Sequence, residues 1–367
     1  MALPLLLRWP NREPAHEPLL KQLGADQILA EEPIPNAVTR GLWPGIRGTP
    51  RRRGDPDVAS ASREAWVDAN GHLAACERAL HPERTPILAQ AFKESERSVP
   101  FETLELALIE ARVNGGNFVL SVEPRYREAL LKNDPKALEA WKSLGLTAAW
   151  LARNEGLFGR PTLPVITVIV EEGAPATEIA NLLYRRGGSP AIASVARVPS
   201  PNPNRIVALV AAGLKSVPKQ VFDHAAAGST VVIDSPPDPK WKLAKQDKDR
   251  NIYSLGKGQI VAYHSRVADP SEFALDVIDI VSHKRRAARL WNALASIPLA
   301  TEGPLLHVIN YGSPSKDEVQ ARFQGQFAKA TLLRPEAAPL ELKVYRRASM
   351  TEVFLPGITR LAVVQFM

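Results

Sequence analysis

The fold of this chain is decided by Leu163-Pro-Val-Ile-Thr-Val-Ile-Val170, which is followed by Ala176-Thr-Glu-Ile-Ala-Asn-Leu-Leu-Tyr-Arg-Arg186 and Gly187-Gly188. The first run is short, apolar and rich in β-branched residues, which is typical of a strand buried on both faces. The second has apolar residues at helical spacing, and the two glycines predict its end. Further strands and a helix are expected at 191–198, 205–211, 217–227 (the helix) and 229–234. This alternation predicts a parallel, Rossmann-like sheet with helices on its faces.

The loops of this predicted sheet carry none of the usual ligand motifs. Glu171 and Glu172 follow the first strand, where a dinucleotide site would need glycines and backbone N–H groups. Gly256-Lys257-Gly258 lies between two strand-like runs and is interpreted as a hairpin turn. The loop after Val210 has no cysteine, so amidotransferase chemistry is excluded for this module. We therefore expect no cofactor, and the sequence assigns no metal site.

Length and composition set the outer bounds. With 367 residues the chain is expected to form two or three domains. The net charge of +7 is mild and the basic residues are dispersed, which argues against nucleic acid as a partner. The single cysteine, Cys76, is expected to be a small core residue. The apolar run 1–7 is too short for a secretory signal and no run is long enough to span a membrane, so a soluble, cytoplasmic protein is expected, unless the gene starts upstream.

Residues 1–160 alternate between expected strands and helices. The strands are expected at 3–9, 27–31, 38–43, 86–92 and 117–123, and the helices at 18–23, 62–80 and 101–113. This order is typical of a β/α (TIM-like) barrel, but a complete barrel takes about 250 residues and eight strands. The prediction is therefore a partial barrel over residues 1–160, or one completed by something outside this chain.

Barrel active sites lie at the carboxyl ends of the strands. Glu123 ends the last expected strand and is predicted to be one catalytic carboxylate, with Asp68 or Glu64 as its partner, since these two lie four residues apart on one face of an expected helix. Glycosidic bond cleavage needs such a pair, because one acid protonates the leaving oxygen and the other attacks or activates water. The predicted substrate-binding residues are Trp43, Trp66, Arg63, Asn70, Glu31 and Glu32.

Each of these residues also has a structural interpretation. A glutamate at a strand end is often a cap or an ion-pair partner, and Glu123 has Arg125 close by in the sequence. A helical tryptophan is usually part of the core, and Glu64 with Asp68 can form a solvated face.

The last part of the chain changes character. Residues 269–294 are expected to form one long helix with Leu290 on its apolar stripe and basic residues near its end. Six short strands then follow, separated by Gly, Pro, Ser and Lys, and they predict a small antiparallel β-sandwich. His307 alternates with apolar neighbours and is interpreted as a structural histidine. The predicted boundaries are 1–160, 161–300 for the Rossmann-like module, and 301–367 for the sandwich.

Two segments carry a family resemblance. The run Val221-Phe-Asp-His-Ala-Ala-Ala-Gly-Ser-Thr-Val-Val-Ile233 is similar to the helix–Gly–strand signature of the β-galactosidases with a trimerisation domain. The ending resembles that family's terminal sandwich, through Leu306-His-Val-Ile-Asn-Tyr311, Phe327-Ala-Lys-Ala-Thr-Leu332, Thr351-Glu-Val-Phe-Leu355 and Leu361-Ala-Val-Val364. The resemblance implies a hydrolase barrel, a class I amidotransferase-like module without its cysteine, and a small sandwich. It assigns no catalytic pair to this chain.

These observations predict a glycoside hydrolase-like protein that acts on or binds carbohydrate without a cofactor. The alternative is a non-catalytic carbohydrate-binding or assembly subunit of the same ancestry. A third interpretation is an α/β protein that senses a small molecule in the sheet crevice. The resemblance further implies a homo-oligomer formed through the Rossmann-like module.

Overall fold

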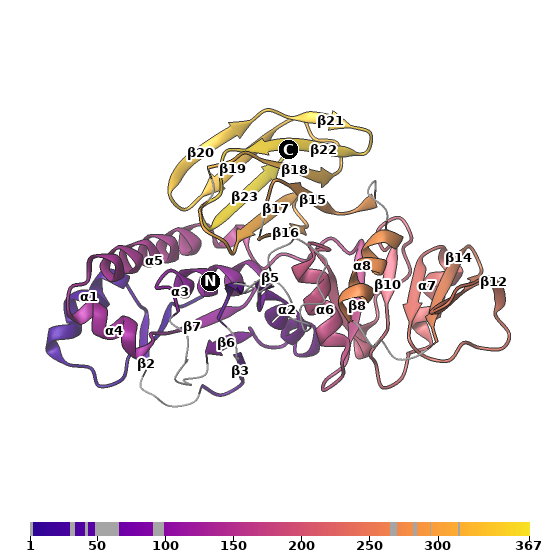
Figure 1. Ribbon diagram of the computed structural model, residues 1–367, viewed down its shortest axis with the longest axis horizontal. Helices are drawn as coiled ribbons and strands as arrows, with labels where there is room; N and C mark the ends of the chain where they lie inside the picture. The colour runs from indigo at the N-terminus through magenta and orange to yellow at the C-terminus, as the bar shows by residue number, and fades with distance from the viewer. Residues whose placement is uncertain are drawn as a thin grey trace, which may run out of the picture.

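The computed structural model describes residues 3–29, 34–40, 43–47, 66–90, 99–264, 270–281, 285–293, 295–314 and 316–367. An N-terminal α/β part and a central α/β part lie side by side, and a C-terminal part made of antiparallel strands sits over their junction (Figure 1). The predicted mixed α/β class with an added β domain is therefore confirmed.

The N-terminal part is built on a parallel sheet with the order β2-β1-β7-β6-β3. Its strands are β1 (Leu6–Arg8), β2 (Gln27–Leu29), β3 (Ala37–Arg40), β6 (Ile87–Gln90) and β7 (Asn117–Ser121). Its helices are η1 (Pro14–His16), α1 (Glu17–Leu23), α2 (Gly71–Leu80), α3 (Thr103–Val113), α4 (Pro124–Leu131), α5 (Pro135–Arg153) and η2 (Glu155–Leu157). Strand β7 is buried along its whole length, as its apolar sequence requires, and α3 packs between it and α5.

The expected helix 62–80 is wrong at residues 66–68. A strand, β5 (Trp66–Asp68), pairs antiparallel with β4 (Gly45–Arg47), and the helix α2 begins only at Gly71. The partner strand lies about twenty residues earlier in the chain, so local periodicity could not report it. Because Asp68 lies in a strand, the prediction that it shares a helical face with Glu64 is also wrong.

The central part is a seven-stranded sheet with the order β12-β13-β14-β11-β10-β8-β9. Its strands are β8 (Ile166–Val170), β9 (Ala191–Ser194), β10 (Ala208–Val210), β11 (Thr230–Ile233), β12 (Lys242–Gln246), β13 (Arg250–Leu255) and β14 (Gly258–Tyr263), and its helices are α6 (Ala176–Arg185), η3 (Val195–Arg197), α7 (Gln220–Ala227) and α8 (Pro270–Ile280). Five strands are parallel in a doubly wound order, and β12–β13 adds an antiparallel edge.

Local signals set the limits of these central elements. The helix α6 stops where Gly187 adopts a φ of 70° and the N–H of Gly188 donates to the Leu183 carbonyl. Leu255 pairs with Gly258 across a two-residue turn, so the predicted hairpin is confirmed.

The C-terminal part holds two antiparallel sheets, β15-β18-β22-β21 and β16-β17-β23-β19-β20. The strands are β15 (Ala288–Trp291), β16 (Ser296–Thr301), β17 (Leu305–Asn310), β18 (Val319–Gln324), β19 (Ala330–Arg334), β20 (Ala337–Leu342), β21 (Tyr345–Arg347), β22 (Met350–Leu355) and β23 (Leu361–Phe366). The sheets pack face to face, and the rings of Phe323 and Phe366 stack at 4.8 Å between them. The outer face of β17, with Leu305 and Ile309, packs into the core of the N-terminal part.

The long helix expected over 269–294 is confirmed at residues 270–280 and is wrong at residues 288–291. The helix α8 ends at Ile280, and Leu290 belongs to β15, which pairs with β18 some thirty residues later. Strand pairing with a distant partner overrides the local helical pattern here. Strand β15 and all of β16 except Thr301 precede the predicted boundary at residue 301, yet both strands pair within the C-terminal sheets.

Buried polar and aromatic residues join the three parts. His307 lies on β17, fully buried, and its Nε2 is 3.0 Å from the Leu157 carbonyl oxygen. Cys76 is buried in α2, where burial raises the pKa of its thiol to about 12.

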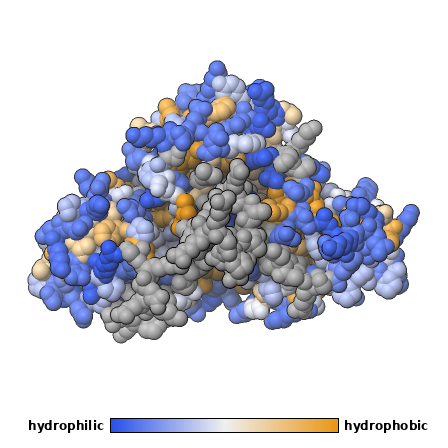
Figure 2. All heavy atoms as spheres, viewed as in Figure 1, coloured by the Kyte–Doolittle hydropathy of each residue, from blue (hydrophilic) through white to orange (hydrophobic). Residues whose placement is uncertain are grey.

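In the view of Figure 2 the outer surfaces of the three parts are mostly hydrophilic. The described helices include none that is long and apolar enough to span a bilayer.

Candidate functional site

The carboxyl edge of the N-terminal sheet brings together the ends of several strands. Strand β1 is level with its neighbours on both sides, because Arg8 is the register partner of Leu29 in β2 and of Ser121 in β7. Gln90 ends β6 at the same edge. Arg8, Ser121 and Gln90 are all buried, and the Gln90 Oε1 atom has no hydrogen-bond partner among the described residues. Sequence reasoning missed Arg8 and Gln90, although both lie within two residues of the ends of expected strands.

Glu123 lies two residues beyond the end of β7 and is half-buried at this edge. Burial raises the pKa of its carboxyl group, while the Arg125 guanidinium and a hydrogen bond with the Trp43 side chain act in the opposite direction. Two predicted site residues, Glu123 and Trp43, are thus brought together. Among the described residues Arg125 supplies the only charge that acts on the Glu123 carboxyl.

Asp68 takes a different position. It lies in β5, is buried, and its carboxylate is 3.9 Å from the Arg185 guanidinium at the end of α6. Its register partner is Gly45, two residues after Trp43, so the β4–β5 ribbon connects the Trp43–Glu123 contact with the central part. The ion pair gives Asp68 a role in joining the two α/β parts.

Asn70 belongs to a buried network at the junction of all three parts. Its backbone N–H donates to the Glu110 carboxylate, which also accepts a 2.9 Å hydrogen bond from the Tyr311 hydroxyl. Tyr311 hydrogen bonds with Tyr184, which accepts in turn from the Asn114 side chain at 3.0 Å. Burial and the Glu110 charge raise the pKa of both tyrosines. The network fixes the start of α2, directly after Asp68.

Several predicted residues cannot be placed. Arg63, Glu64, Glu31 and Glu32 lie outside the described residues, and of Trp66 only the backbone is described. Three other tryptophans of this region, Trp9, Trp141 and Trp150, are buried in the core and have no free face for a sugar ring.

The crevice at the switch point of the central sheet is closed by its own side chains. The backbone N–H of Gly213 donates to both Asp234 carboxylate oxygens at 3.0 Å. The N–H of Lys215 donates to Glu171 at 2.9 Å, and its ammonium lies 3.8 Å from the same carboxylate. An anionic ligand would have to displace both carboxylates, which argues against the small-molecule-sensing interpretation. Groups of three or more potential metal ligands do not occur within the described segments.

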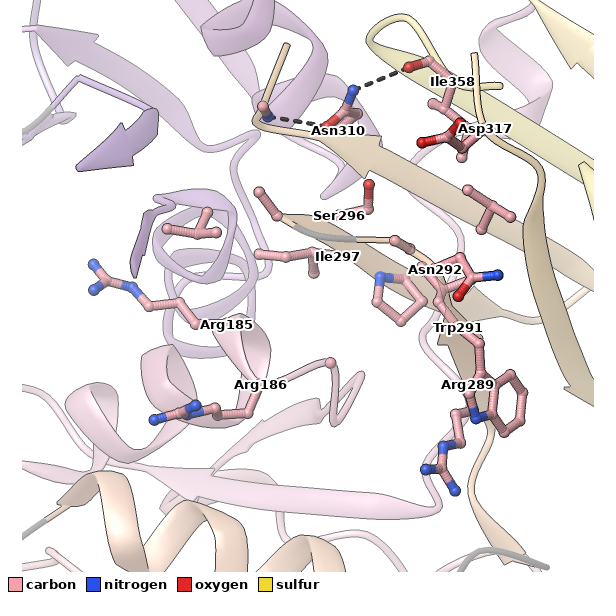
Figure 3. A pocket seen from close by; sticks show the side chains of 18 of the residues that line it. Arg185, Arg186, Arg289, Trp291, Asn292, Ser296, Ile297, Asn310, Asp317 and Ile358 are labelled. Carbon is pink, nitrogen blue, oxygen red and sulfur yellow. Dashed lines mark hydrogen bonds between the residues drawn. The ribbon is translucent and has the colours of Figure 1, made fainter. Parts of the chain in front are cut away.

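A large pocket of about 1240 Å³ opens where the three parts meet. In Figure 3 Arg185 and Arg186, at the end of α6, stand on one side of the view, and Arg289 and Trp291, from β15, stand on the other. Ser296, Ile297 and Asn310 from β16 and β17 complete its wall. Sequence reasoning missed this pocket because its lining comes from segments far apart in the chain.

Comparisons with known proteins complete the description. The sequence matches no family model and no curated protein. The fold is similar to that of β-galactosidase from Bacillus circulans sp. alkalophilus, with 10% identity and a TM-score of 0.54 over 82% of this chain and 58% of that one. It is also similar to α-L-fucosidase isoenzyme 2 from Paenibacillus thiaminolyticus, with 9% identity and a TM-score of 0.53 over 81% and 62% of the two chains.

A third match is a catalytic mutant of Gan42B, a GH42 β-galactosidase from G. stearothermophilus, with 10% identity and a TM-score of 0.50 over 81% of this chain and 56% of that one. The three parts therefore define a glycoside hydrolase-like fold, and within that class the fold is β-galactosidase-like. This chain spans less than two thirds of the length of each of these enzymes.

Proposed function

We propose that this chain binds carbohydrate at the carboxyl edge of the N-terminal sheet and cleaves a glycosidic bond there, with Glu123 as the general acid. The observation that carries the proposal is the state of Glu123. It is a half-buried carboxyl group with a raised pKa, hydrogen bonded to an indole, at the edge where barrel enzymes do their chemistry. A raised pKa favours the protonated form of a carboxyl group, and that form can donate its proton to a leaving oxygen.

The strand order supports a partial barrel as the scaffold. Strands that follow one another in this sheet are neighbours: β1 pairs with β2, β3 with β6, and β6 with β7. The last strand, β7, then pairs with the first, β1, so among the described strands the ring is open only between β2 and β3. Pairing of the first strand with the last is how a β/α barrel closes, whereas doubly wound sheets order their strands differently. The similarity to carbohydrate-active enzymes points to the same scaffold.

The second carboxylate is proposed to be Glu64, as the sequence predicts, or else Glu31 or Glu32. Asp68 is committed to Arg185, and no described carboxylate acts on Glu123. Arg8 is the register partner of both Leu29 and Ser121, so these two residues lie at the same height in the sheet. Glu31 is two positions after Leu29, and a chain of that length spans at most about 7 Å. A carboxylate from this segment can therefore reach the same edge.

The alternative is a non-catalytic carbohydrate-binding or assembly subunit. The commitment of Asp68 to Arg185 and the single charge acting on Glu123 favour it. Turnover separates the two proposals, because both require sugar binding and only the first requires bond cleavage.

Sugar binding is tested by titrating the protein with a panel of oligosaccharides while following intrinsic tryptophan fluorescence. A sugar at the carboxyl edge is expected to perturb the half-buried Trp43, and Trp43→Phe, which loses the indole N–H that contacts Glu123, is expected to weaken binding about tenfold. Trp241→Phe in the central part is the matched control. A panel in which no sugar changes the fluorescence or the thermal stability would exclude carbohydrate as the ligand.

We further propose that the central part mediates self-association. Leu243 on the edge strand β12 and Leu275 on α8 are 49% and 43% exposed, and an exposed edge strand invites pairing. Light scattering at micromolar concentration is expected to show an oligomer that Leu243→Lys or Leu275→Lys weakens, whereas Leu146→Lys on α5 leaves it intact. A wild-type monomer at this concentration would remove the proposal.

A further inference from the structure

The pocket between the three parts has a chemical character of its own. The described residues that line it include four arginines, Arg185, Arg186, Arg286 and Arg289, and two carboxylates, Asp317 and Glu318. Guanidinium groups bind carboxylates, sulfates and phosphates through paired N–H donors. Walls this rich in arginine favour an anionic occupant over a neutral one.

Arg286 is the group whose charge is least compensated. Its side chain is only 16% exposed, and its counter-ion Asp279 lies 3.9 Å away and is itself 79% exposed. The Nε atom of Arg286 has no hydrogen-bond partner among the described residues. Burial and the neighbouring charge of Arg289 lower the pKa of Arg286. A buried charge beside a like charge is costly, and an anion in the pocket would relieve that cost.

Trp291 holds the arginines in place rather than serving as a sugar platform. The Arg289 guanidinium lies 4.5 Å from its ring centroid and the Arg322 guanidinium 4.6 Å. Arg322 is in turn fixed by an ion pair of 2.5 Å with the buried Glu352. These stacked contacts orient Arg289 at the pocket wall before any ligand arrives.

The pocket also lies close to the edge that carries Glu123. Ile46 and Val67, on the β4–β5 ribbon, line the pocket. Ile46 is only three positions after Trp43, which contacts Glu123, and a chain of that length spans at most about 11 Å. The pocket volume of about 1240 Å³ exceeds the range of about 300–1000 Å³ that is usual for small-molecule sites. The space therefore suits an extended ligand with several units.

We propose that this pocket binds the anionic groups of an acidic oligosaccharide, one that carries sulfate or carboxylate substituents, whose other end lies at Glu123. This inference rests on the function proposed above and names its substrate class. Ser296 and Asn292 supply short polar groups at the wall for sugar hydroxyls, while the arginines select the charge.

The test is calorimetric titration with five probes. Three are oligosaccharides of equal length: a neutral one, a sulfated one and a uronate-containing one. Inorganic sulfate and inorganic phosphate form the free-anion arm. We expect at least one acidic oligosaccharide to bind about tenfold or more tightly than the neutral one, with an affinity that falls as salt is added. The two acidic arms distinguish sulfate from carboxylate recognition.

Arg286→Gln is expected to remove the preference for the acidic probe, and Arg286→Lys to retain part of it. Arg197→Gln makes the same charge change on an exposed side chain outside the pocket lining and should leave the preference intact. If Arg286→Gln does not fold, the salt dependence of the wild-type affinity still decides.

The outcomes separate this inference from the function proposed above. Equal binding of neutral and acidic probes would overturn the inference and leave carbohydrate binding in place. Binding of the free anions with no gain for the acidic oligosaccharides would mean an adventitious ion only and would also overturn it. If none of the oligosaccharides binds, both this inference and the proposed function are excluded.

Discussion

Replacing Glu123 by glutamine is expected to lower glycoside turnover by about 10²–10⁴-fold, because the amide cannot donate a proton to the leaving oxygen. The side chain keeps its size and can still accept the hydrogen bond of the Trp43 indole, so the fold and sugar affinity are expected to be retained. The raised pKa of Glu123 also determines the direction in which turnover changes with pH. The acid is active when protonated, so turnover is expected to fall as pH rises through the raised pKa of Glu123, and that limb should vanish in Glu123→Gln.

The measurement is product release from the oligosaccharide that binds best, compared between wild type and variant at equal folded concentration. Glu128→Gln is the matched control, because Glu128 lies on the exposed face of α4 and pairs with Lys132. The second carboxylate is identified by measuring four further variants in the same assay: Glu31→Gln, Glu32→Gln, Glu64→Gln and Asp68→Asn. Near-normal turnover in Glu123→Gln would contradict its role as the acid, and a wild type that binds sugar without releasing product would favour the non-catalytic alternative.

Acidification from pH 7 to pH 4 is expected to cost several kcal/mol of folding stability through two buried histidines. Burial and the Arg185 charge lower the pKa of His72 to about 3, and burial lowers that of His307 to about 4. In the unfolded chain both histidines have a pKa near 6.5. At a pH between 6.5 and the folded pKa values, the unfolded chain therefore binds more protons than the folded one, and folding stability falls as the pH falls. At pH 4 each histidine contributes a loss of about 3 kcal/mol as an upper estimate.

Carboxyl groups whose pKa is raised, Glu105 and Glu123 among them, oppose this loss. Burial raises the pKa of Glu105, which accepts a hydrogen bond from Ser143 at 3.0 Å, so its protonation stabilises the fold slightly as pH falls towards its unfolded value. Urea unfolding at several pH values is the measurement. His307→Gln should flatten the dependence between pH 6.5 and 4, whereas the exposed His264→Gln should not. A free energy of unfolding that stays constant over this range would show that the histidines are not buried in the neutral form.

The sequence predicted those elements whose signals are local. The run that contains β8 is apolar on both faces, and Gly187 supplies the left-handed residue that ends α6, so neither element depends on distant residues to be recognised. The alternation of apolar residues in β17 likewise predicted a strand, although not that its outer face packs on the N-terminal part. Where the fold depends on a distant partner, the prediction was wrong, as for β5 with β4 and for β15 with β18.

The site residues that could be predicted are likewise those with a local sequence signal. Glu123 could be found because it stands at the end of a recognisable strand, and Pro124 starts the next helix. Its contact with Trp43 and the ion pair of Asp68 with Arg185 join segments separated by 80 and 117 residues, and no local pattern reports them. The arginine-lined pocket is assembled from all three parts, so it became visible only in the folded structure.

The central claim is that carbohydrate binds at the carboxyl edge of the N-terminal sheet. Hydrogen–deuterium exchange with and without a saturating oligosaccharide, measured on the Glu123→Gln protein so that the ligand survives, tests it most directly. We expect slower exchange in peptides that cover residues 43–47 and 119–126, with the central edge strands 242–255 unchanged. Protection confined to the C-terminal sheets or to the central part, with the 119–126 peptide unaffected, would contradict it.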